Sequence, residues 1–161
     1  MAQVRDNDQL LPSVFDRLID REPTVPQDSP QSRSQVLYEL KQSVRRDLQN
    51  LLNTRWRCDI WPPDYDQLEM SLVNYGIPDF SGVNMGGPES QRRLIEIVEK
   101  AIEFFEPRFV RFSLVQSGAQ DSFDRTLRFK IEGLLRAEPA PEPVSYDTVM
   151  DVSSAEFEVR S

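Results

Sequence analysis

The 161-residue chain contains no histidine and a single cysteine, Cys58. Without histidine, neither a Ser-His-Asp nor a Cys-His catalytic arrangement can form. The usual zinc, copper and non-haem iron sites are excluded as well, because one thiolate cannot replace the missing imidazoles. A lone cysteine cannot make an internal disulfide, and such usage fits a reducing compartment. We therefore expect no metal site and no cofactor, and catalysis by carboxylates alone remains as an enzymatic option.

Long apolar runs and an excess of basic residues are missing too. No stretch approaches the roughly 18 apolar residues of a membrane-spanning helix, and the first residues lack the pattern of a signal peptide. The formal net charge is −8, which disfavours contact with the phosphates of nucleic acids and with anionic membranes. These absences predict a soluble cytoplasmic protein that neither binds nucleic acid nor inserts into membranes. Small-molecule chemistry on carboxylates alone, or binding to protein partners, remains.

Helical periodicity is present over much of the chain. Apolar residues recur at helical spacing over 35–53, 65–75 and from Pro88 to Pro107, which predicts about three helices. In the second of these, Leu68, Leu72 and Val73 are expected to face inward, with Gly76 ending the helix in a left-handed conformation.

The period changes after the third predicted helix. Alternation of apolar and polar residues predicts strands at 109–115, 127–132, 144–150 and 157–159. Helices followed by an antiparallel β-meander make an α+β domain. The alternation at 127–132 further predicts a sheet with one face covered by helices and one face exposed to solvent.

The first 20 residues are separated from this domain. Apolar residues at helical spacing over 10–20 predict a short amphipathic helix, and 21–34 is a linker rich in Pro, Ser and Gln. The domain itself then spans 35–161. A short apolar helix ahead of such a linker either folds back on its own domain or docks on a partner. For docking, the candidate partner-binding residues are Leu11, Phe15 and Leu18.

Signals for small-molecule chemistry are weak. Gly82, Gly86 and Gly87 precede a predicted helix, but the Gly-Lys-Ser/Thr pairing of a phosphate-binding loop is missing, so a turn explains them better. A glycosidase needs two carboxylates across a cleft. Since 27 acidic residues supply such a pair in almost any fold by chance, no catalytic residue can be named.

Glu106, Pro107 and Arg108 follow the third predicted helix and break an electrostatic rule. Glu106 stands at the helix C-terminus, where the dipole disfavours anions by a few tenths to about 1 kcal/mol. Pro107 fixes the chain between the two charges, so both should leave the helix in set directions. Such a rigid pair predicts an ion-pair or bidentate recognition site for a partner. Removal of Arg108 alone is then expected to leave the fold intact.

At these residues the sequence becomes recognisable. Segment 104–109 resembles the Glu-Pro-Arg core of the gene-25-type baseplate wedge family of contractile phage tails, and the similarity is close to its TssE-like members from type VI secretion baseplates. Other segments similar to family motifs occur in the family's order, at 10–18, 43–48, 52–55, 74–81, 129–133 and 144–148. Each is weak alone, and together they cover nearly the whole chain.

The resemblance implies a structural subunit and not an enzyme. Its expected partners are the wedge proteins TssF and TssG, with TssK as a further contact, and the sheath proteins TssB and TssC. Glu106, Pro107 and Arg108 would contact the wedge, and the sheet would initiate the contractile sheath, with 144–150 or 157–159 as the docking edge. Two alternatives stay open: a muramidase-like glycoside hydrolase with paired carboxylates, and an adaptor whose N-terminal helix binds an unrelated partner.

Overall fold

The computed structural model describes residues 14–18, 24, 32–56, 64–68, 71–80, 83, 85, 87–117, 126–137 and 140–160. In these parts the chain is α+β, with a short helix α1 (Val14–Leu18), two long helices, α2 (Arg33–Asn53) and α3 (Pro88–Phe105), and one antiparallel sheet. The four strands are β1 (Phe109–Gln116), β2 (Thr126–Leu135), β3 (Glu142–Asp151) and β4 (Glu156–Arg160). The predicted fold class and the four predicted strands are confirmed.

Helix α2 begins two residues before the predicted start, because Ser32 forms a capping box with Gln35. The Gln35 backbone N–H donates to the Ser32 hydroxyl over 3.3 Å, and the Ser32 N–H donates to the Gln35 side chain over 2.8 Å. This satisfies two backbone donors that the first helical turn leaves unpaired. The apolar stripe then buries Val44, Leu48 and Leu51.

Helix α3 forms where the pattern predicted it. Pro88 occupies the first turn, where its fixed φ suits the helix and its missing N–H costs nothing. The helix ends at Phe105, before Pro107. Leu94, Val98 and Ile102 are buried on its inner face, as their spacing indicated.

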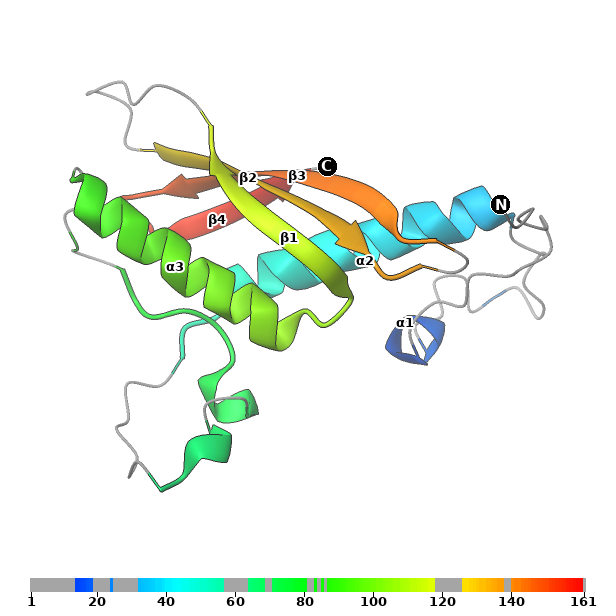
Figure 1. The fold of residues 1–161 in the computed structure, drawn as a ribbon, viewed down its shortest axis with the longest axis horizontal. Coiled ribbons are helices and arrows are strands. Elements are labelled where there is room, and N and C mark those ends of the chain that lie inside the picture. The colour runs from blue at the N-terminus through cyan, green and yellow to red at the C-terminus, as the bar shows by residue number, and fades with distance from the viewer. Residues whose placement is uncertain are drawn as a thin grey trace.

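The predicted second helix, 65–75, is wrong. Two single-turn 3₁₀ helices occupy this region, η1 (Asp66–Leu68) and η2 (Leu72–Asn74). The Ser71 hydroxyl donates to the Leu68 carbonyl and accepts from the Val73 N–H, and such side-chain bonds compete with a continuous helix. Leu72 is 86% exposed and Val73 is also exposed. The segment projects from the body of the molecule (Figure 1), so it has no core in which to bury an inner face.

Gly76 does adopt a positive φ, of +113°, and its position also depends on the end of α2. A Cβ atom at Gly76 would lie 2.3 Å from the Thr54 carbonyl oxygen. That oxygen accepts the Ile77 N–H over 2.9 Å, within an isolated parallel bridge between Arg55 and Ile77. Gly76 therefore allows the projecting segment to return against the end of α2.

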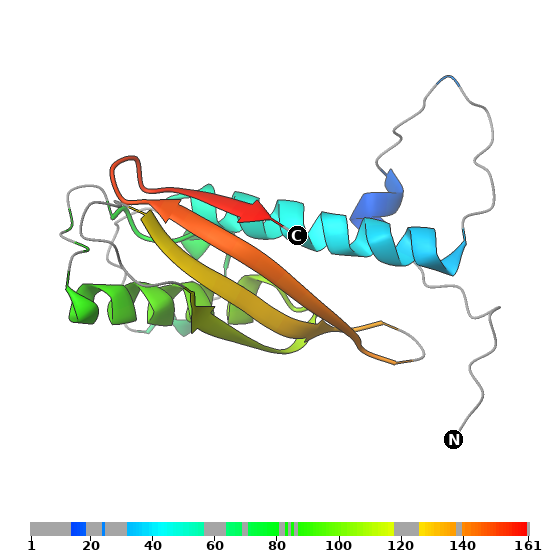
Figure 2. The same cartoon turned by 90° about the horizontal axis from the view of Figure 1, so that it is seen from above.

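The sheet has the sequential order β1-β2-β3-β4 and lies above both long helices in Figure 1. Seen from above in Figure 2, α2 runs on the β4 side and α3 on the β1 side. Burial alternates along β2, β3 and β4, which confirms a sheet with one covered and one exposed face. No helix within the described ranges has both the length and the hydropathy to cross a membrane.

Candidate functional site

The connection between α3 and β1 carries a buried ion pair. Glu106 caps α3 through its N–H, which donates to the Ile102 carbonyl over 2.9 Å, and the residue is only 4% exposed. Its two carboxylate oxygens accept short hydrogen bonds from Nε and Nη2 of Arg108. Bidentate pairing of this kind fixes both side chains in orientation as well as in distance.

The same guanidinium also reaches helix α2. Arg108 Nη2 donates to Asp47 over 2.6 Å, and Nη1 donates to the Ser43 hydroxyl over 3.0 Å. The Arg108 carbonyl accepts the Arg136 N–H over 2.7 Å, just beyond the end of β2. One arginine thus joins α3, β1, α2 and the end of β2.

The contacts continue to the N-terminal helix α1. Arg46 donates to Asp47 and to Asp16, each over 3.0 Å. The Ser43 hydroxyl donates to Asp16 over 2.8 Å. We call this set of six side chains the junction network; its members are Asp16, Ser43, Arg46, Asp47, Glu106 and Arg108. It connects three segments that are far apart in the sequence.

The opposite charges in the junction network stabilise each other in their charged forms. Burial opposes the charge on Arg108, but its bonds and attraction to Glu106 and Asp47 outweigh this and raise the pKa of the guanidinium. Nearby, burial and the same two carboxylates raise the pKa of Tyr75, which keeps its phenol neutral. Each carboxylate of the network accepts from arginine or serine donors. This arrangement anchors chain segments and does not present a free base to a substrate.

The structure brings Glu106 and Arg108 together but turns their charges inward. The sequence pattern had suggested that they leave the molecule toward a partner, whereas Arg108 folds back on α2 and Glu106 is buried. The physical reason is Asp47, a second carboxylate on a neighbouring helix that the local pattern cannot reveal. Pro107 between them is exposed. Contact of this element with a partner stays a prediction.

The structure describes the three N-terminal candidate partner-binding residues to different extents. Leu11 lies outside the described residues, and Phe15 is placed only as a backbone position of α1. Leu18 is 76% exposed, and Val14 on the same helix is similarly exposed. Helix α1 therefore meets α2 through Asp16 and presents these two apolar side chains to solvent.

Sequence reasoning missed Asp16, Ser43 and Asp47. A usable signal existed for Ser43, a polar residue beside Val44 at the margin of the apolar stripe of α2, where it is buried. A polar group in that position requires a partner. In the structure its partners include Asp16 and the Arg108 guanidinium, which no spacing within α2 indicates.

Comparison with known proteins identifies a matching family. The sequence profile of a family described as "Baseplate wedge protein gp25" matches residues 38–140. The matched span runs from within α2 to just before β3, and it contains Glu106, Pro107 and Arg108. No curated protein and no solved structure matches the chain.

Proposed function

The chain belongs to the gp25 baseplate wedge family, and from this premise we propose that it is a TssE-like subunit of a type VI secretion baseplate. Membership in the family implies a structural role in a baseplate and contact with other baseplate components. The finer proposal is that the chain joins the wedge proteins TssF and TssG, and TssK as a further contact, to the sheath proteins TssB and TssC. It would thereby initiate sheath assembly in the cytoplasm.

The orientation of α1 is the observation that supports contact of this chain with the wedge. An amphipathic helix that folds back on its own domain buries its apolar side chains. Here Asp16 faces α2, while Val14 and Leu18 are exposed. Exposed apolar side chains held at a fixed place on the surface suit a protein partner. We propose that α1 and the Glu106-Pro107-Arg108 element together form the wedge contact.

This proposal predicts that Leu18→Glu weakens wedge assembly. A charge on the apolar side of α1 would have to be desolvated against the partner, so affinity should fall by about 2 kcal/mol, the scale of an interface hot spot. Co-purification of TssF and TssG with the tagged chain measures the effect. The matched control is Tyr38→Glu on α2, since Tyr38 is also exposed and lies outside the proposed contact. Equal recovery of TssF and TssG with both variants would contradict the proposed wedge contact.

A structural role also predicts that the chain does not hydrolyse peptidoglycan. Glycoside hydrolysis needs one carboxyl group as general acid and another free to act as base or nucleophile, whereas Glu106 and Asp47 share one guanidinium. Purified protein incubated with cell walls between about pH 4 and about pH 8 should release no reducing sugars. Release that a single Glu or Asp substitution abolishes would favour the muramidase alternative.

A further inference from the structure

The two edges of the sheet differ in how their backbone groups are satisfied. β4 is an edge strand, and helix α2 covers its outward groups with side chains. Asn53 both accepts the Phe157 N–H and donates to the Phe157 carbonyl, each over 2.9 Å. Gln49 accepts the Val159 N–H over 3.2 Å and donates to the Phe157 carbonyl over 3.3 Å. Arg45 donates to the Val159 carbonyl over 3.2 Å. These are the bonds that a fifth strand would otherwise make.

The β1 edge has no such cover in the part of the chain that the structure describes. The Ser117 N–H donates to the Arg128 carbonyl over 3.0 Å. In an antiparallel pair, backbone groups point toward and away from the partner strand at alternate residues, so this bond fixes which residues of β1 bond to β2. The backbone groups of Arg111, Ser113 and Val115 then face β2, and those of Phe112, Leu114 and Gln116 face away. Among the described residues, no hydrogen bond reaches the outward groups. As far as the described residues go, the β1 edge is therefore open to an added strand.

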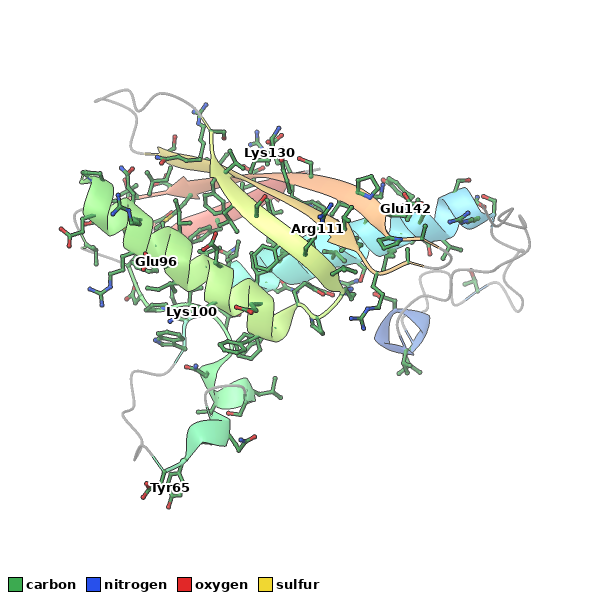
Figure 3. The ribbon with its side chains drawn as sticks, viewed as in Figure 1. Tyr65, Glu96, Lys100, Arg111, Lys130 and Glu142 are labelled. Carbon is green, nitrogen blue, oxygen red and sulfur yellow. The ribbon has the colours of Figure 1, made fainter. Side chains whose placement is uncertain are left out.

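The exposed face of the sheet carries opposite charge at its two sides. Over β1 and β2 the outward-facing charges are mostly basic: Arg111, Arg128 and Lys130, with Glu132. Over β3 and β4 they are mostly acidic: Asp147, Asp151, Glu156 and Glu158, with Arg160. In Figure 3, Lys130 is on the side of the sheet away from Glu96 and Lys100 of α3, and Arg111 is on β1. The β1 side of one molecule thus complements the β4 side of another.

We infer that Gln49 and Asn53 seal the β4 edge, and that β1 is the edge at which an extended strand of a sheath subunit pairs. Two open edges of opposite charge would allow copies of this chain to add head to tail without limit. Amide side chains that occupy the outward groups of β4 remove one of the two edges. The sheet can then start an assembly from β1 without polymerising itself.

The exposed side chains define the partner strand. Phe112 and Leu114 are only half-buried, so apolar residues at alternate positions of an added strand would complete their cover. On the other face, Arg111 favours an acidic residue in the neighbouring strand. We therefore expect an extended segment with alternating apolar and acidic residues. This assignment rests on the proposed link to the sheath. It replaces both predicted docking strands: 144–150 lies in β3, which is an internal strand of the sheet, and 157–159 lies in the sealed edge β4.

The seal is tested on the purified chain alone. The variant Gln49→Ala/Asn53→Ala should associate with itself, and its mean mass in sedimentation should rise with concentration while wild type stays constant. Adding Leu114→Pro to this variant should abolish the association, because proline removes a donor that faces the β1 edge. The control is Asn50→Ala, an exposed residue of the same helix. A double variant that keeps its circular dichroism and its wild-type mass would overturn the inference. If it unfolds, the single variant Gln49→Ala provides the same test.

The docking edge is tested in cells that carry a fluorescent sheath subunit. Leu114→Pro should reduce sheath assembly about tenfold, the ratio expected for one or two lost backbone hydrogen bonds. Gln116→Pro, at an exposed position, repeats this test if Leu114→Pro unfolds. Glu158→Ala, at an exposed position of β4, alters the other edge strand and should leave sheaths normal. The reverse pattern would overturn the inference. Normal sheaths after deletion of the whole gene would instead refute the proposed function, and leave the self-association test unaffected.

Discussion

Replacing Arg108 with alanine should lower the free energy of unfolding by about 3–5 kcal/mol, because it leaves a buried carboxylate without its counter-charge. Glu106 is 4% exposed, and the Arg108 guanidinium supplies two hydrogen bonds to it. The same substitution removes the bonds to Asp47 and Ser43 on α2. Chemical denaturation measures the difference, with the slope of unfolding free energy against denaturant concentration kept the same for both proteins.

The origin of this effect can be separated from general loss of packing. In the Arg108→Ala background, Glu106→Gln should recover part of the lost stability, since a neutral amide is less costly to bury than an unpaired charge. Arg111→Ala, on the exposed face of β1, should change stability by less than about 0.5 kcal/mol. If Arg108→Ala instead keeps wild-type stability and loses TssF and TssG, the pair serves a partner, as the sequence pattern suggested.

Gly76→Ala should destabilise the fold by about 3 kcal/mol or more. A φ of +113° costs a residue with a Cβ atom about 1–3 kcal/mol. The added methyl group would also lie 2.3 Å from the Thr54 carbonyl oxygen. That oxygen is held by the Ile77 N–H, so the clash is relieved only by breaking the bridge between Arg55 and Ile77. Denaturation midpoints, and hydrogen exchange of the Ile77 amide, measure the two consequences.

Gly87→Ala provides the matched control for this substitution. Gly87 precedes α3 with a φ of −100°, and a Cβ atom there would meet nothing within 4 Å. Its replacement should therefore cost less than about 1 kcal/mol. Equal losses of stability at Gly76 and Gly87 would show that neither the positive φ nor the contact with Thr54 restricts position 76.

The sequence by itself determined the secondary structure of the sheet and of the two long helices. Periods of 3.6 and 2 are local properties of the chain, and a segment such as Leu127 to Glu132 displays its own alternation without reference to the rest of the molecule. Proline at the start of α3 and after its end acts through adjacent backbone atoms, so its effect is also readable locally. The same logic failed at 65–75, because an apolar pattern forms a helix only where a core is present to cover it.

Only the tertiary structure decided where the functional side chains point. Arg108 meets Asp47, 61 positions away in the sequence, and this contact turns inward a charge that the local pattern directed outward. Asn53 and Phe157 are 104 positions apart, yet their bonds decide which edge of the sheet is open. Hydrogen bonds and ion pairs act over a few ångströms, so their partners are set by how α2 packs against the junction and against β4. No periodicity along the chain encodes that packing.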